Sequence, residues 1–258
     1  MARFIDLVLC IFPFEENLYN ESGLRAVFVG HPMIERLETQ KIETERDPNL
    51  VGLFPGSRVR EVRKIFPVMI EAARLLLQPK PDLRFRVAAA SGGLAREMSE
   101  MLKSERLEDR QAIEIIVGQT AALMQQTWAG IVASGSATLE AAYFQMPFVL
   151  IYKVAWATYI AARLVVKVDY LGMPNLLADK EVVPEFIQHE AKPELIVNTV
   201  LSLMEDANAR DRMISDFDSI IAKLGRGGAS EKAAQTIIQE LNARRFPDLR
   251  GDREIALP

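Results

Sequence analysis

The sequence is poor in the side chains that cross-link a chain or bind transition metals. Its 258 residues contain a single cysteine, Cys10, and two histidines, His31 and His189. One cysteine cannot form a disulfide bond within the chain, and such sparse use fits a reducing cytoplasm. These three side chains are also too few for an ordinary zinc site. The composition therefore excludes an internal disulfide and argues against a metal centre built from histidine and cysteine.

The sequence also lacks an excess of positive charge and a long uninterrupted apolar run. Its net charge is −4 and its pI is about 5.5, whereas a nucleic-acid-binding domain normally has a basic face. Arg3 and Asp6 interrupt the first apolar run, so we expect no signal peptide. Lysine and arginine interrupt the longest one, Phe148–Val168, which is therefore not expected to span a membrane. We expect a soluble or peripheral protein that does not bind nucleic acid.

Two common nucleotide-binding patterns are missing. Gly-x-Gly-x-x-Gly follows none of the predicted strands, and the Walker A pattern does not occur, which argues against nicotinamide cofactors and ATP hydrolysis. Asp216-Phe217-Asp218 matches the Asp-x-Asp pattern of metal-dependent sugar transferases. It lies within an amphipathic helical pattern rather than after a strand, which indicates a solvated helix face. We therefore expect neither a cofactor nor a metal site.

From Leu50 onward, short apolar segments alternate with longer segments of helical periodicity. The predicted strands are residues 51–54, 85–90, 113–117, 131–133 and 148–152, and the predicted helices between them are residues 61–77, 94–103, 120–127 and 137–144. Such alternation forms β-α-β units with right-handed crossovers and a parallel sheet. The sequence therefore predicts an α/β fold, a Rossmann-like parallel sheet with helices on both faces.

The segments on either side are less regular. Before this region we predict strands at residues 4–12 and 25–29, with a short helix between them and a polar linker at residues 35–49. After it we predict a helix at 155–167, a loop at 169–175, a strand at 182–188, and helices at 192–205, 207–224 and 230–244. The tail from Phe246 is predicted to be disordered.

Three predicted strand-to-helix turns are rich in small residues that suit a phosphate. They are Gly56-Ser57-Arg58, Ser91-Gly92-Gly93 and Ser134-Gly135-Ser136. Ligands of parallel sheets bind at the carboxyl ends of the strands, and a helix N-terminus attracts anions. An arginine can fork onto a phosphate, and Glu140, one turn into its helix, could accept hydrogen bonds from a ribose. The three turns on one edge favour a ligand that carries phosphate.

Each of these features also has a structural interpretation. Ser134 or Ser136 could simply be the N-cap of a packing helix. Arg58 could be a surface arginine paired with Glu61, one turn further along. Single residues do not decide between the interpretations, and the coincidence of three such turns favours phosphate binding.

The motifs together resemble one known family. Six of them occur in order: Phe12-Pro13-Phe14-Glu15, Phe28-Val29-Gly30-His31-Pro32, Phe54-Pro55-Gly56-Ser57-Arg58 with Glu61, Ala133-Ser134-Gly135-Ser136-Ala137-Thr138-Leu139-Glu140, Pro174-Asn175-Leu176-Leu177 and Val183-Pro184-Glu185-Phe186-Ile187-Gln188. Residues 5–244 thereby resemble the lipid-A-disaccharide synthases, sugar transferases of the GT-B type with two Rossmann-like domains. Another UDP-sugar enzyme of this fold, such as an epimerase, fits the last two motifs less well.

The resemblance implies a glycosyltransferase of lipid A biosynthesis. The donor would be UDP-2,3-diacylglucosamine, the acceptor 2,3-diacylglucosamine 1-phosphate, and the products lipid A disaccharide 1-phosphate and UDP. It implies catalysis without a metal or other cofactor, in the cytoplasm of a Gram-negative bacterium, peripheral to the inner membrane. The alternative is a UDP-sugar-binding fragment without catalysis, or one subunit of a split enzyme.

The resemblance also assigns residues to the UDP donor. Ser57 and Arg58, with Gly56, would hold the diphosphate. Residues near it would be Ser134, Gly135, Ser136 and Thr138, and Glu140 would hold the ribose. Further motif positions lining the cleft are Asn175, Glu185 and Gln188, to which no individual role is assigned.

Family members have roughly a hundred or more residues ahead of the position that matches Ile5, about one small domain. The resemblance implies that this region carries the catalytic base and most of the acceptor surface. It predicts three parts: residues 1–49 as the remnant of the N-terminal acceptor domain with a linker, 50–228 as the donor-binding domain, and 229–258 as a helix packing back toward the N-terminal part, with a tail. The candidate protein partners are a separate N-terminal half and a second copy.

Overall fold

The computed structural model describes residues 4–104, 112–154 and 169–245, so the helix expected at 155–167 and the tail from Phe246 lie outside the described residues. The chain forms two compact units, Met1–Thr39 with Ala222–Pro258, and Gln40–Ile221. These boundaries differ from the expected ones, which follow residues 49 and 228. Residues 40–46 belong to the second unit because Gln125 on that unit bonds the backbone of Gln40 and Ile42, each at 2.9 Å.

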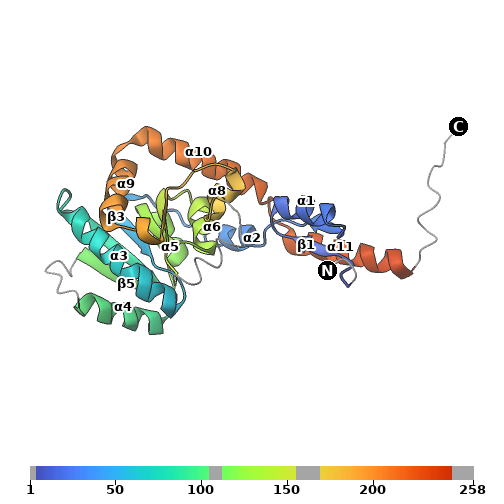
Figure 1. Cartoon of the computed structure of the whole chain (residues 1–258), viewed down its shortest axis with the longest axis horizontal. Coiled ribbons are helices and arrows are strands. Elements are labelled where there is room, and N and C mark those ends of the chain that lie inside the picture. The colour runs from blue at the N-terminus through green and yellow to red at the C-terminus, as the bar shows by residue number, and fades with distance from the viewer. Residues whose placement is uncertain (1–3, 105–111, 155–168, 246–258) are drawn as a thin grey trace. The chain divides into compact units, whose positions relative to one another are not determined.

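The second unit contains a six-stranded parallel sheet in the order β5-β4-β3-β6-β7-β8. The strands are β3 (Asp47–Phe54), β4 (Arg84–Ala89), β5 (Ile113–Val117), β6 (Thr127–Ala133), β7 (Phe148–Tyr152) and β8 (Glu185–Ile187). The described helices of this unit are α3 (Val59–Leu77), α4 (Gly92–Ser104), α5 (Thr120–Gln126), α6 (Ser136–Tyr143), α8 (Met173–Ala178), α9 (Pro193–Glu205) and most of α10 (Ala207–Lys223), with a short 3-10 helix η2 (Gln188–Glu190). Figure 1 shows this sheet among its helices.

The strand order explains how the helices cover the sheet. From β3 the chain crosses over to β4 and β5 on one side, and from β6 it crosses over to β7 and β8 on the other. Right-handed crossovers in opposite directions put helices on opposite faces. Accordingly, α3 packs with α4 and α9, whereas α6 packs with α5 and α8. The sheet is thus covered on both faces, and its strands are correspondingly apolar: Leu53, Phe85, Ile131 and Phe148 are fully buried.

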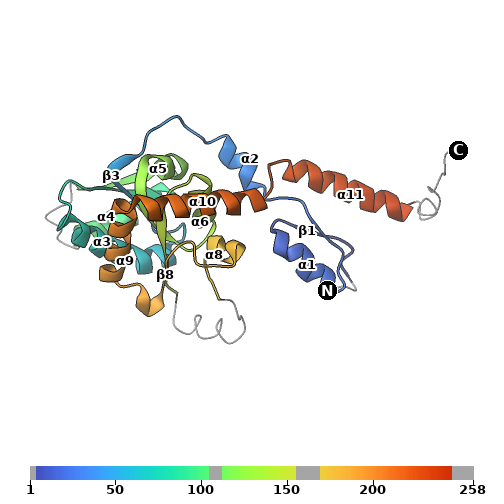
Figure 2. The same ribbon diagram turned by 90° about the horizontal axis from the view of Figure 1, so that it is seen from above.

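The first unit is smaller. Its described residues form a two-stranded parallel sheet of β1 (Val8–Cys10) and β2 (Ala26–Phe28), with helices α1 (Pro13–Glu21), α2 (Met33–Glu38) and α11 (Ala229–Arg245). Two polar contacts fasten α11 within this unit: Glu240 pairs with Arg25, and Glu35 accepts hydrogen bonds from the backbone of Gly228 and Ala229. Figure 2 gives a second view of these elements.

The predicted linker at residues 35–49 is wrong at both ends. Its first residues belong to α2, and its last belong to β3, which begins at Asp47. The early part of β3 is exposed, and its register against β6 shifts between Asp47 and Val51. Such an irregular, polar strand start has no alternating apolar pattern, and the sequence therefore resembles a loop there.

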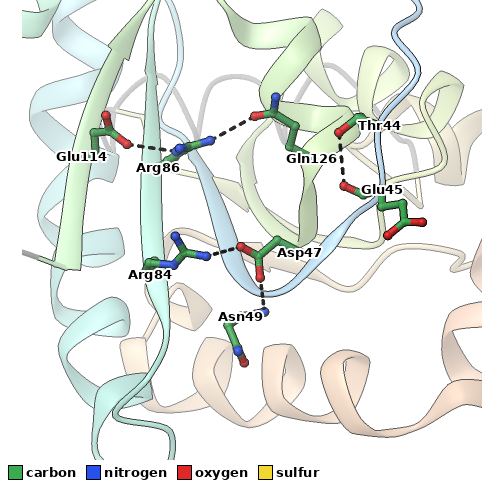
Figure 3. A network of polar contacts seen from close by, with 8 residues as sticks. All are labelled: Thr44, Glu45, Asp47, Asn49, Arg84, Arg86, Glu114 and Gln126. Atoms are coloured by element: carbon green, nitrogen blue, oxygen red, sulfur yellow. Dashed lines mark hydrogen bonds and ion pairs between the residues drawn. The ribbon is translucent and has the colours of Figure 1, made fainter.

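Polar side chains join the strands near their amino ends. Asp47 pairs with Arg84, and Arg86 contacts Glu114 and Gln126, both at 3.0 Å (Figure 3). These contacts link β3, β4 and β5 at the edge of the sheet where the strands start. The turns that are candidates for ligand binding lie at the opposite end, where the strands finish.

A half-buried arginine, Arg46, holds the C-terminal end of α6. Arg46 donates hydrogen bonds to the carbonyl oxygens of Met124 and Thr127, both at 2.7 Å, and to that of Phe144, just after α6. Burial, with a smaller contribution from Arg210, lowers the pKa of Arg46 to about 10, so it stays protonated at neutral pH. A cation suits the negative end of a helix dipole, and this contact fixes α6 from its C-terminus.

Candidate functional site

The two central strands, β3 and β6, lie side by side where the direction of the crossovers reverses. Phe54 at the end of β3 pairs in register with Val132 of β6. The turns that follow, Gly56-Ser57-Arg58 and Ser134-Gly135-Ser136, therefore begin next to each other. A Cβ atom placed on Gly56 would lie 3.8 Å from the Cβ of Ala133, which confirms their closeness. In open parallel sheets this reversal point is where ligands bind.

The first turn directs Arg58 into solvent at the start of α3. Arg58 is the N-cap residue, with an extended backbone, and its carbonyl oxygen accepts hydrogen bonds from the amides of Glu61 and Val62, each at 3.0 Å. Its side chain is 80% exposed, and Nη1 lies 2.8 Å from Oε1 of Glu61. The structural interpretation of Arg58 as a partner of Glu61 is thus correct. It does not exclude phosphate binding, because exposed ion pairs of this kind are weak.

Both the backbone conformation and the lack of space at position 56 require glycine. Its φ is +106°, and an added Cβ would lie only 2.8 Å from Oε2 of Glu61. We expect Gly56→Ala to lower the free energy of unfolding by about 1–2 kcal/mol, measured by urea denaturation. Gly92→Ala is the matched control, because an added Cβ there meets no described atom within 4 Å and lies at the start of α4. Equal stability of the two variants would contradict this account of the turn.

The second turn is held by its own side chain and backbone. Thr138 is fully buried, and its hydroxyl and amide both donate to the carbonyl of Gly135, at 2.7 and 3.1 Å. The amide of Ser134 donates to Ile151 at 2.9 Å. Gly135, not a serine, is the N-cap of α6, so the interpretation of Ser134 or Ser136 as that cap is wrong. Ser136 is exposed at the start of the helix, and Glu140 is half-buried one turn later.

The third turn follows β4, on the other side of β3. Ser91 caps α4: its hydroxyl oxygen accepts from the amide of Leu94 at 3.3 Å, and its carbonyl accepts from Ala95 at 3.0 Å. Ser91 to Gly93 are all exposed. The Ser91 side chain therefore caps its own helix. For this third turn, helix capping is a better explanation than phosphate binding, whereas the two central turns remain candidates for phosphate.

Asn175 of α8 and Glu185 of β8 form a polar centre in which Asn175 is buried and Glu185 is half-buried. The Asn175 side chain is fully buried; Nδ2 donates to Val183 O at 2.7 Å and to Glu185 Oε1 at 2.8 Å. Its Oδ1 accepts from the amides of Val182 and Val183, each at 2.8 Å. Glu185 in turn accepts from the backbone amides of two residues that precede α8, Leu171 at 3.0 Å and Gly172 at 2.8 Å.

Gln188 extends the pairing of β7 and β8 with its side chain. The last pair in register is Tyr152 with Ile187. Beyond it, the side-chain amide of Gln188 binds both backbone groups of Val154: Oε1 accepts from Val154 N at 2.9 Å, and Nε2 donates to Val154 O at 3.3 Å. Gln188 is buried and has φ of +52°, a conformation uncommon for residues other than glycine. It thereby fixes the backbone that leaves β7.

The structure thus divides the predicted site residues into two groups. Gly56 to Arg58 and Ser134 to Ser136 meet at the reversal point. Among the others, Thr138, Asn175, Glu185 and Gln188 bind the backbone of nearby segments, and Asn175 and Glu185 also bind each other. Glu140 stands apart from both groups, half-buried one turn into α6. Sequence reasoning missed these backbone partners; a lone asparagine between Pro174 and two leucines was the signal that a buried amide organises this part of the chain.

Other candidate chemistry is limited. Among the described residues no three His, Cys, Asp or Glu side chains are grouped to hold a metal ion. Asp216 and Asp218 lie on α10; Asp216 pairs with Lys180 at 2.7 Å, and Asp218 accepts from Gln145 at 2.6 Å, so both carboxylates of the Asp-x-Asp pattern have protein partners. In the first unit, burial, followed by the nearby Arg36, lowers the pKa of His31, whose Nδ1 accepts from the amide of Met33 at 3.1 Å.

Comparison with solved structures agrees with this architecture. The UDP-GlcNAc 2-epimerase from Neisseria meningitidis, solved with UDP-GlcNAc, matches with a TM-score of 0.62 and 15% identity, over 92% of this chain and 62% of that one. The S. aureus MnaA structure with UDP matches with the same TM-score and identity, over 93% of this chain and 61% of that one. At this identity the likeness shows a shared fold, of the kind found in GT-B glycosyltransferases and these epimerases.

Sequence comparisons identify the family. The family model described as lipid-A-disaccharide synthetase matches residues 1–239. The lipid-A-disaccharide synthase of Anaeromyxobacter dehalogenans (strain 2CP-C) is 34% identical over 245 residues, which are 92% of this chain and 63% of that protein. That of Persephonella marina is 31% identical over 258 residues, 94% of this chain and 66% of that protein. This chain therefore spans just under two thirds of these relatives, and it belongs to the lipid-A-disaccharide synthase family.

Proposed function

We propose that this chain binds the UDP-sugar donor of a lipid A disaccharide synthase, with the diphosphate at the two central turns. The observation that carries the proposal is the meeting of Gly56-Ser57-Arg58 and Ser134-Gly135-Ser136 at the reversal point of the sheet. Family membership supplies the donor class, a UDP-linked 2,3-diacylglucosamine. The two structural neighbours, which were solved with UDP or UDP-GlcNAc, support a uridine nucleotide as the ligand of this fold.

The reaction would transfer the diacylglucosamine unit to 2,3-diacylglucosamine 1-phosphate and release UDP. As the glycosidic bond to the donor breaks, negative charge grows on the leaving diphosphate. Arg58 and the first amides of α3 and α6 would stabilise that charge, because donors fixed in advance cost little reorganisation. Glu140 would bind the ribose. Asn175, Glu185 and Gln188 would act indirectly, by fixing the backbone segments that they bind. The catalytic base would lie outside this chain.

The acyl chains of both sugars imply work at a membrane surface, and we propose the cytoplasmic face of the inner membrane. Within residues 4–104, 112–154 and 169–245, none of the helices has the length and apolar character needed to cross a bilayer. A second candidate function is UDP-sugar binding without catalysis, either as a fragment or as a subunit beside a separate N-terminal half. It requires only the two central turns, both of which lie within this chain.

Calorimetric titration of the purified chain with UDP, followed by a disaccharide assay on the same sample, tests the proposal. Binding with turnover would mean that the catalytic base lies within this chain. Binding without turnover would support the donor-binding role and the second candidate function. The absence of UDP binding would contradict the proposed site.

A further inference from the structure

Glu61 places a negatively charged side chain beside the turn Gly56-Ser57-Arg58. It lies in the first turn of α3, and its carboxylate reaches back to the residues before the helix. Oε1 is 2.8 Å from Nη1 of Arg58, and Oε2 is the atom that a side chain on Gly56 would meet at 2.8 Å. Both oxygens therefore lie at the turn. The positive end of the α3 dipole favours an anion there, and Glu61 supplies one.

A diphosphate at this turn would compete with Glu61 for the same guanidinium. The Glu61 side chain is 30% exposed and that of Arg58 is 80% exposed, so the pair is weak and can open. A phosphate binds a guanidinium by two parallel charge-assisted hydrogen bonds, which can displace the single contact with Glu61. Once the phosphate departs, Glu61 can pair with Arg58 again.

The charge of the ligand decides how strongly Glu61 opposes it. A terminal phosphate carries about −1.5 to −2 charge at neutral pH, more than a phosphate esterified on both sides. The UDP product has such a terminal phosphate, whereas a UDP-sugar donor does not. The repulsion from Glu61 is therefore greater for the product than for the donor.

We propose that Glu61 is a positioning residue that promotes UDP release: it competes with the product's phosphates for Arg58 and repels the charge that the reaction creates. The inference rests on the proposed function of the turn. The opposite role would be to hold Arg58 in the orientation that binds phosphate. In that case Glu61 would raise the affinity for UDP, whereas we propose that it lowers it.

The test is UDP binding by the full chain and by Glu61→Gln, with affinity from calorimetry and dissociation rate from stopped flow. We expect the variant to bind UDP about three- to fivefold more tightly, the scale of an exposed ion pair, mainly through slower dissociation. The gain should shrink at high salt, since screening weakens charge effects at exposed sites. A merely structural role would not produce this salt dependence. An unchanged or weaker affinity would overturn the proposal.

The matched control is Glu71→Gln. Glu71 also forms an i,i+3 ion pair with an arginine of the same helix, Arg74, in the reverse order along the chain and with two hydrogen bonds, about 15 Å further along at the usual helical rise. It removes the same charge, and we expect no change in UDP affinity. If Glu71→Gln tightens binding equally, the effect is one of net charge, and the proposal fails.

Two further variants separate this inference from the proposed function. In the Arg58→Ala background, Glu61→Gln should give a smaller gain, because the competition for Arg58 is gone. If Arg58→Ala alone leaves UDP affinity unchanged, or if the parent chain binds no UDP, the proposed diphosphate site fails and the inference with it. If Arg58→Ala weakens binding but Glu61→Gln gives no gain, only the inference fails. If thermal melts show that Glu61→Gln is poorly folded, Glu61→Ala is used for the same comparison.

Discussion

Replacing Arg58 with alanine is expected to weaken UDP binding by about 1.5–3 kcal/mol, roughly a ten- to hundredfold rise in the dissociation constant. Arg58 is the last residue of the turn after β3, and its side chain is 80% exposed, so its guanidinium is available to a ligand at the reversal point. The loss should be large because hydrogen bonds between charged groups exceed those between neutral ones. Calorimetric titration with UDP measures the change.

Two controls sharpen this result. Arg74→Ala removes an arginine and an i,i+3 ion pair, that with Glu71, from the far end of α3, and it should leave UDP affinity unchanged. Arg58→Lys keeps the charge but loses the planar fork, so its affinity should lie between those of the parent chain and Arg58→Ala. Full affinity in Arg58→Ala would remove this residue from the site.

Replacing Asn175 with aspartate is expected to lower the free energy of unfolding by about 2–4 kcal/mol at neutral pH. The parent amide makes four hydrogen bonds in a fully buried position. Aspartate preserves the shape but replaces the Nδ2 donor by an oxygen, which would face the carbonyl of Val183 and the carboxylate of Glu185. Urea denaturation measures the loss, and Asn198→Asp, at an exposed position on α9, is the control.

The sign of the pH dependence follows from the same contacts. Burial and the neighbouring Glu185 would raise the pKa of the new carboxyl group in the folded variant above its unfolded value. The folded variant then retains a proton that the unfolded chain releases, so its stability relative to the parent falls as the pH rises above about 4. Near pH 4 the difference should be smallest. A deficit that does not change with pH would argue against this arrangement of Asn175 and Glu185.

The sheet could be predicted because its strands are buried on both faces. β7 was predicted to the residue because it is a continuous apolar run between Pro147 and Lys153, and β5 because its apolar residues, interrupted only by Glu114, end at Gly118. β6 was predicted too short. It begins at Thr127 directly after α5, and the Thr127 hydroxyl donates to Leu123 one helical turn earlier, so no turn signal separates the two elements.

The site was predictable only in part. The structure places the two central turns next to each other, as their residue types and their strands predicted, and phosphate binding there stays a prediction. The contacts of Gln188 with Val154 join residues 34 positions apart in the sequence. Those of Glu185 with Leu171 and Gly172 join residues 14 and 13 positions apart. No local pattern specifies such pairs, so the sequence suggested that these side chains face a ligand, whereas in the structure their polar groups bind backbone.

The central claim is that UDP binds at the carboxyl ends of β3 and β6. Its most direct test is a nuclear magnetic resonance titration of the ¹⁵N-labelled chain with UDP, following the backbone amides. The account predicts the largest shifts at residues 56–59 and 134–137, with little change at Asp47, Arg84 and Glu114 on the opposite edge of the sheet (Figure 3). Shifts concentrated at that opposite edge, or a saturating titration that leaves both central turns unaffected, would contradict it.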